Sequence, residues 1–260
     1  MGSGGKMLLN NKLFNTTKFL LGMFLLIFFG QLFPYRIEIF SGEGIFAGYN
    51  YPLNLSGYFN SFFLFILWIA IFVSSLMLIF SKKINIAAFS LFIMWIVTIS
   101  KIPFFLFPPH LGYIGFTLLT LSFVERKEAR FVLPNRIYNS FWIILGLSYF
   151  TSATAKYLSS SEWATGELLK YLLESPVTYD YFLTNWIKGL NSEVLNYFSK
   201  LILLLEFLIL PLSLLKNKKI TALAITCLHL GILITCRIPD ISLVLILTAW
   251  ILIGDKNEKS

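Results

Sequence analysis

The chain has 260 residues, of which 57% are hydrophobic and 13% are charged, and its mean hydropathy is +0.76. Because soluble domains carry about one-quarter charged residues, this composition excludes a water-soluble fold and indicates an integral membrane protein. The net charge of +8 lies in short clusters between apolar runs, which favours a lipid bilayer as partner over nucleic acid.

Apolar stretches long enough to cross about 30 Å of hydrocarbon recur along the chain, and in lipid a single segment satisfies its backbone only as a helix. We interpret residues 1–6 as a remnant of an expression tag, 7–254 as one transmembrane domain and 255–260 as a cytoplasmic tail. The prediction is an all-α polytopic helical bundle. Its spans, about eight in number, are 18–38, 60–80, 85–105, 110–125, 138–157, 195–215, 220–237 and 241–254.

The charges of the connecting segments predict the orientation of these spans. With the N-terminus in the cytoplasm, thirteen Lys and Arg residues fall in the inner segments, whereas the outer loops 41–59 and 104–110 contain none. Basic residues are retained on the cytoplasmic side of membranes. We therefore expect both termini in the cytoplasm, in a bacterial inner membrane.

The longest outer segment, 158–194, predicts an interfacial lid. Residues 163–173 and 178–190 are typical of two short amphipathic helices, and Pro176 separates them. Their aromatic residues suit the boundary between membrane and water.

Ionisable side chains inside the spans are the candidate functional residues, because each costs at least about 2.5 kcal/mol near the bilayer centre. They are Arg36, Glu38, Lys101, His110, Lys156, Glu206, His229, Arg237 and Asp240. The predicted topology puts most of them in the outer half of the bilayer, with Glu206 and His229 deeper, where both could line one cavity. Structural explanations stand beside this one. A Lys can extend to the interface, and Glu206 can pair with His229 or with a Lys.

The sequence lacks the residues that several kinds of chemistry require. Cys227 and Cys236 lie about 13 Å apart on one predicted helix, so they cannot form a disulfide, and there is no CxxC pair. With two histidines and no HExxH sequence, we expect no metal site. Nucleotide-driven transport would need a phosphate-binding loop of the GxxxxGK[ST] kind, which the sequence lacks.

The segment from Tyr149 to Gly166, YFTSATAKYLSSSEWATG, resembles a signature of the HTTM family, the membrane domain shared with vitamin K-dependent γ-carboxylase. In that pattern a Tyr-Phe pair and small residues precede a Lys, and Trp-x-x-Gly follows. Here the Lys is Lys156 and the Trp is Trp163, with a spacing about two residues longer than in the carboxylases. Weaker similarities are the loop 40–46, His110 at the start of a span, Glu206 in LLLEFL, and His229 followed by Arg237 and Pro239.

The resemblance implies a γ-carboxylase-like membrane enzyme. Lys156 would be the base that deprotonates reduced vitamin K, a quinol, and so starts an oxygen-dependent epoxidation that generates a strong base toward a peptide Glu. His110 and His229 would polarise the quinone or the substrate. Binding of substrate or cofactor would fall to Trp163, Glu206, Arg237 and Lys101.

The chain departs from the carboxylases in offering only 158–194 outside the membrane, whereas they hold their substrates on a large extramembrane domain. Small bacterial members of the family suggest instead the modification or maturation of an exported peptide. A second hypothesis is a non-catalytic partner or lipid-binding subunit of a peptide-maturation or immunity system. A transporter is disfavoured, because the candidate charges do not continue into the cytoplasmic half.

Overall fold

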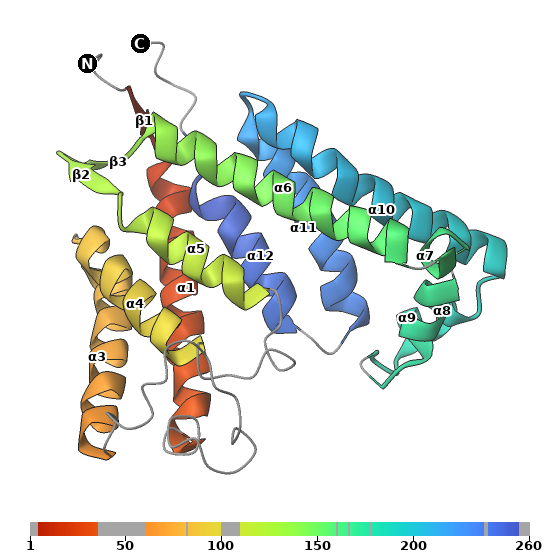
Figure 1. The fold of residues 1–260 in the computed structure, drawn as a ribbon, viewed down its shortest axis with the longest axis horizontal. Helices are drawn as coiled ribbons and strands as arrows, with labels where there is room; N and C mark the ends of the chain where they lie inside the picture. The colour runs from red at the N-terminus through yellow and green to blue at the C-terminus, as the bar shows by residue number, and fades with distance from the viewer. Residues whose placement is uncertain are drawn as a thin grey trace. The chain divides into compact units, whose positions relative to one another are not determined.

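The computed structural model describes residues 5–35, 61–81, 83–99, 110–159, 161–165, 167–176, 178–236 and 239–254. These residues fold mostly as α-helices (Figure 1), in agreement with the all-α prediction. The chain divides into two compact units. The first unit comprises Met1–Ile137 with Gly254–Ser260, and the second comprises Tyr138–Ile253.

The first unit consists of helices and three short strands. In chain order these are β1 (Lys6–Leu8), α1 (Asn11–Leu32), the 3-10 turn η1 (Phe33–Tyr35), α3 (Ser61–Phe80), α4 (Ile84–Ile99), α5 (His110–Leu121), β2 (Glu125–Lys127) and β3 (Arg130–Pro134). Helix α1 begins where the side chain of Asn10 accepts a hydrogen bond from the Leu13 amide at 3.1 Å, which satisfies a free N–H of the first turn. The helix therefore starts several residues before residue 18, where the predicted span begins.

Small residues and aromatic rings hold the helices of the first unit together. Gly22 of α1 lies so close to α3 that an added Cβ would come within 2.4 Å of Ile79 Cγ1. Deeper in the unit, the ring of Phe29 meets Trp68 edge-on at 5.4 Å and Trp95 at 5.7 Å, and all three side chains are buried. Such pairs contribute about 0.5–1.5 kcal/mol beyond the area that they bury.

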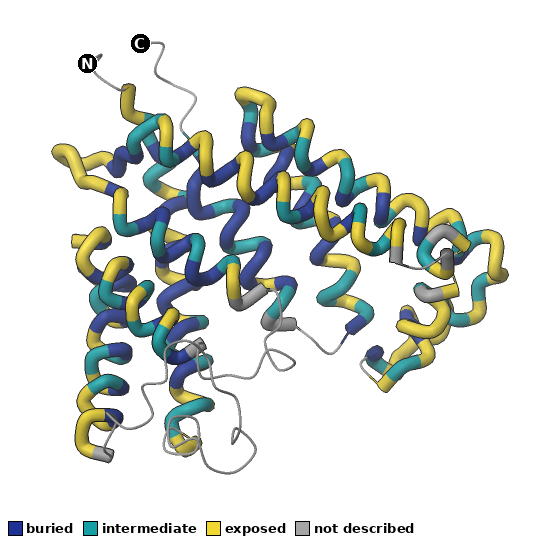
Figure 2. The backbone as a smooth tube through the Cα atoms, in the orientation of Figure 1, coloured by how far each residue is buried: buried dark blue, intermediate teal, exposed yellow. Residues whose placement is uncertain are grey.

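The outer faces of these helices are as apolar as their inner faces. Figure 2 shows buried and exposed positions alternating along α3. Its exposed side chains are large and hydrophobic, and they include Phe62, Phe63, Phe65, Ile66, Ile69, Val73, Leu76 and Phe80. A contiguous exposed apolar surface of this kind is typical of contact with lipid.

A small antiparallel sheet, which the sequence did not predict, has the strand order β1-β3-β2. Met7 is paired with Leu133, and Arg126 with Phe131. Lys6, which we interpreted as part of a tag, lies in β1 and forms an ion pair with Glu125 of β2. Lys6 thus takes part in the fold of the first unit.

The second unit is built from helices alone among its described residues. They are α6 (Asn135–Ser159), whose first three residues belong to the first unit, α7 (Ser161–Thr165), α8 (Glu167–Glu174), α9 (Phe182–Lys188), α10 (Ser192–Leu214), α11 (Lys218–Thr235) and α12 (Pro239–Ile251). Gly146 of α6 allows close approach to α10, because an added Cβ would lie 3.0 Å from the Leu210 Cα. Helices α11 and α12 are joined by a 2.8 Å hydrogen bond from Trp250 Nε1 to Thr226 Oγ1.

Three short helices, rather than the two predicted, make up the connection between α6 and α10. Pro176 lies between α8 and α9, as predicted. The connection is fastened to the end of α11, because the Tyr179 amide donates to the Thr235 carbonyl at 2.9 Å and the Tyr181 hydroxyl donates to the Ile234 carbonyl. Thr178 and Cys236 also form an isolated β-bridge.

Four described helical segments are long and apolar enough to cross a membrane: Asn11–Tyr35, Phe62–Phe80, Ser192–Leu214 and Lys218–Thr235. Three shorter apolar helices are Ile84–Thr98, Gly112–Leu121 and Ile241–Ile251. Helix α6 has 25 residues but is less apolar than these four. The chain is therefore a helical membrane protein. The number of about eight spans stays a prediction.

Candidate functional site

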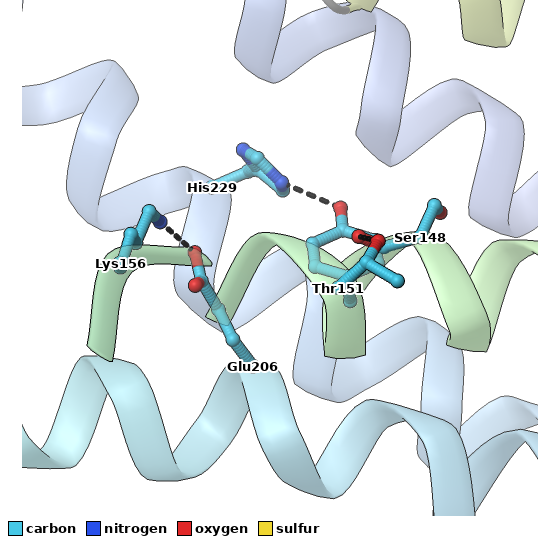
Figure 3. Close-up of polar contacts among 6 residues, drawn as sticks. Ser148, Thr151, Lys156, Glu206 and His229 are labelled. Atoms are coloured by element: carbon cyan, nitrogen blue, oxygen red, sulfur yellow. Dashed lines mark hydrogen bonds and ion pairs between the residues drawn. The ribbon is translucent and has the colours of Figure 1, made fainter. Parts of the chain in front are cut away.

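Lys156 and Glu206 form an ion pair between α6 and α10 of the second unit. Lys156 Nζ donates to Glu206 Oε1, and Figure 3 shows the two side chains pointing toward each other. The Glu206 side chain is only 7% exposed, whereas that of Lys156 is 28% exposed. Of the two pairings that the sequence left open for Glu206, the structure has the one with a Lys.

Trp163 of α7 completes the surroundings of Lys156. The Lys156 Nζ lies 5.0 Å from the centroid of the indole ring, within the range of a cation–π interaction. The Trp163 carbonyl accepts a hydrogen bond from Ser199 of α10, which fixes α7 against that helix. The Lys156 ammonium is therefore held between a carboxylate and an aromatic face.

His229 of α11 is the third predicted residue of this site. It is 4% exposed, and its Nε2 lies 2.6 Å from the Tyr149 hydroxyl. The Tyr149 and His229 rings meet edge-on at 5.9 Å. Figure 3 shows His229 in the same region as Lys156 and Glu206. If the tyrosine hydroxyl donates to Nε2, the imidazole carries its proton on Nδ1.

Helical periodicity explains why these side chains face one region. Tyr149 and Lys156 are seven residues apart on α6, and Ser199 and Glu206 are seven residues apart on α10. Seven residues make almost two turns of an α-helix, so each pair lies on one face of its helix. Tyr149 and Ser199 were not among the predicted site residues; their spacing from Lys156 and Glu206 places them on the same helix faces but does not by itself distinguish them from other residues there.

Two buried polar atoms of the site have no hydrogen-bond partner among the described residues. They are Glu206 Oε2, an acceptor, and His229 Nδ1. Buried polar groups almost always have partners. Both atoms therefore indicate a bound water, or a ligand with hydroxyl or carbonyl groups. Trp163 adds an aromatic face beside Lys156.

Other chemistries find no support in the described part of the chain. No cluster of three or more His, Cys, Asp or Glu residues there could hold a metal ion. Cys227 and Cys236 are both free thiols, in agreement with the sequence analysis. A hollow on the exposed face of α3 is lined by apolar side chains and Ser81.

The structure thus groups four of the seven predicted site residues, Lys156, Trp163, Glu206 and His229. His110 begins α5 in the first unit, and its side chain lies outside the described part of the chain. Lys101 and Arg237 also lie outside the described residues, as do Arg36 and Glu38. Asp240 lies in the first turn of α12.

Comparison of the chain with protein-family models, with curated proteins and with solved structures finds no match. The HTTM resemblance therefore rests on the motifs of this sequence.

Proposed function

We propose that the chain is an integral membrane enzyme of the HTTM, γ-carboxylase-like kind, which uses a reduced quinone to modify or mature an exported peptide. The observation that carries the proposal is the Lys156–Glu206 pair, set beside Trp163 and close to His229. The family motif is centred on this lysine. The buried atoms without partners, Glu206 Oε2 and His229 Nδ1, support a ligand with oxygen substituents.

In this proposal Glu206 prepares Lys156 to act as a base. A protonated ammonium cannot accept a proton, so the Nζ proton must first pass to Glu206 Oε1 along their hydrogen bond. The result is an amine beside a carboxylic acid, and both are neutral, which suits a site of low polarity. The Lys156 amine then accepts the hydroxyl proton of the quinol, as a general base within hydrogen-bond reach.

The other residues of the site orient the ring. A reduced quinone, when bound, supplies the electrons for reduction of molecular oxygen. Trp163 offers its face to the ring, Glu206 Oε2 accepts a hydrogen bond, and His229 Nδ1–H donates one to a ring oxygen. Tyr149 keeps His229 in this tautomer through Nε2. Additional roles for His110, Lys101 and Arg237 stay part of the proposal.

The proposed setting is a bacterial inner membrane, with both termini in the cytoplasm and about eight spans. Support comes from four long apolar helices, three shorter ones and the hydrophobic exposed face of α3.

A second candidate function is a non-catalytic membrane partner or lipid-binding subunit of a peptide-maturation or immunity system. The observation that favours it is the mutual pairing of the site residues. Lys156 binds Glu206 and Tyr149 binds His229, and such contacts also serve simply to join α6 to α10 and α11.

Oxygen uptake tests the first function against the second. The purified chain in lipid nanodiscs is supplied with vitamin K hydroquinone, and dissolved oxygen and quinone epoxide are measured. The enzyme proposal expects uptake by the wild type, loss in Lys156→Met, and retention in Lys170→Met, which removes an exposed lysine of α8. Absence of uptake in the wild type, or equal uptake in both variants, contradicts the proposal.

A further inference from the structure

Lys18, in the first unit, is a buried lysine that has no counter-charge among the residues described by the structure. It lies in the second turn of α1 and is 6% exposed. Lys6, Lys156 and Lys218 each donate to an oxygen atom, of Glu125, Glu206 and the Ser213 backbone respectively. Lys18 has no hydrogen bond or ion pair with any residue that the structure describes.

A second cation lies beside Lys18. Arg126 of β2 stands opposite Phe131 of β3, with its guanidinium 5.8 Å from the centroid of that ring. The Phe131 ring also contacts Phe14 of α1, and the centroids of the two rings lie 4.6 Å apart. Phe14 precedes Lys18 by one helical turn and lies on the same face of α1. The contact between Phe14 and Phe131 thus brings the Arg126 guanidinium toward the part of α1 that carries Lys18.

An anion would stabilise two neighbouring cations, one of which is buried. Burying a charge is costly unless it is paired, and like charges add to that cost. Glu125, the acidic residue of β2, is already engaged by Lys6. Among the described residues, Arg126 donates a hydrogen bond through its Nε to the Glu128 carbonyl at 3.2 Å and none through its terminal nitrogens, which can therefore bind a ligand.

The surroundings of the two cations match the headgroup region of a bilayer. Figure 1 shows the sheet beside the beginning of α1. Further exposed basic side chains lie there on α1, β3 and the first turn of α6: Lys12, Arg130 and Arg136. The residues that follow Lys18 on α1, Phe19 and Leu20, are exposed and apolar. Basic side chains bordering an apolar surface are typical of sites for anionic lipid headgroups.

We propose that Lys18 and Arg126 bind the phosphate of an anionic phospholipid, whose acyl chains lie along the apolar surface of α1 that begins at Phe19. Arg126 approaches the phosphate oxygens with two guanidinium nitrogens, and Lys18 contributes the second positive charge. A free phosphate shares this chemistry, but it would make no use of the adjoining apolar surface. The site does not depend on the enzyme activity proposed for the second unit.

Native mass spectrometry of the purified full chain tests the site. The protein in detergent is titrated with dioleoylphosphatidylglycerol or with dioleoylphosphatidylcholine, and retained lipids are counted. We expect the anionic lipid to be preferred, with about fivefold weaker binding in Arg126→Gln and in Lys18→Met. The matched control is Lys127→Gln, which removes the same charge from the next position of β2, on the other face of the sheet. It is expected to change binding by less than about twofold.

Three results would overturn the proposal. Equal binding of the two lipids denies the preference for an anion, and an equal loss in Lys127→Gln shows diffuse attraction instead of a site. Displacement of the lipid by millimolar inorganic phosphate, in a manner that depends on Lys18, assigns the site to a free anion. Should Lys18→Met fail to fold, Lys18→Arg replaces it. Retained lipid preference in that variant, together with loss in Arg126→Gln, supports the site, and loss in neither refutes it.

Discussion

Removal of Lys156 and removal of Glu206 are expected to lower the free energy of unfolding by different amounts. Lys156→Met leaves the Glu206 carboxylate, 7% exposed, without its counter-charge. Glu206→Leu leaves Lys156, whose side chain is 28% exposed and can extend toward the surface. The double variant replaces both charges with apolar side chains. Comparison of the two single variants with the double variant therefore isolates the energy of the pair.

The expected magnitudes follow from this difference in burial. Breaking a buried pair by removing one partner destabilises a protein by about 3–5 kcal/mol, and we place Lys156→Met at about 3 kcal/mol. For Glu206→Leu we expect about 1–2 kcal/mol, because the remaining lysine regains contact with polar surroundings. The double variant is expected within about 1 kcal/mol of the wild type, since a buried ion pair is often replaced by apolar residues without loss.

Thermal unfolding in detergent, followed by circular dichroism, measures these differences. For a chain of this size about 1 kcal/mol corresponds to a shift of roughly 2–4 °C, so Lys156→Met is expected to unfold about 8 °C below the wild type. Equal losses in the two single variants would refute the argument from burial. A double variant that loses the sum of the two single effects would show that the two residues do not interact.

Three further predictions concern other parts of the fold. Gly146→Ala is expected to destabilise the second unit by about 1–3 kcal/mol, because the added Cβ would lie 2.4 Å from Ser213 Oγ. The control is Gly231→Ala, where an added Cβ has no atom within 4 Å. In the same unfolding assay this variant is expected to be neutral or stabilising. Glu128 has a φ of 54°, in the left-handed region. Glu128→Gly is therefore expected to be about 1 kcal/mol more stable than Glu128→Ala, and equal unfolding temperatures would contradict this. The hydrogen bond from Lys6, together with its charge, lowers the pKa of Glu125 below the ordinary 4.5. The stabilisation is present above about pH 4.5 and is lost as the pH falls through the lowered pKa. The protection factors of the β1 amides, which are corrected for the intrinsic exchange rate, are therefore expected to fall on acidification, but not in Glu125→Gln.

The long apolar helices could be predicted from the sequence because their hydrophobic runs are bounded by polar residues. The predicted spans 60–80 and 195–215 correspond closely to α3 and α10. Helix α1 begins earlier than predicted, since Asn10 caps a polar first turn that hydropathy assigns to a loop. Helix α5 ends at Leu121 because the chain enters β2. The sheet has strands of three to five residues with distant partners, so no local pattern revealed it.

Part of the candidate site could also be predicted. Lys156, Glu206 and His229 are conspicuous as ionisable side chains in apolar segments, and the family motif added Trp163. Which of the two predicted pairings Glu206 adopts could not be decided from the sequence, because the choice depends on how α6, α10 and α11 pack. Tyr149 was overlooked as a site residue because an uncharged tyrosine in an apolar helix is common. Only its contact with His229 distinguishes it.

Lys156 is proposed to perform chemistry as well as to join helices. This role is tested by oxygen uptake with vitamin K hydroquinone by the Lys156→Met/Glu206→Leu double variant in nanodiscs, because that variant is expected to be as stable as the wild type. We expect a folded double variant without quinol-dependent uptake, beside an active wild type. Uptake by the double variant at the wild-type rate would contradict it.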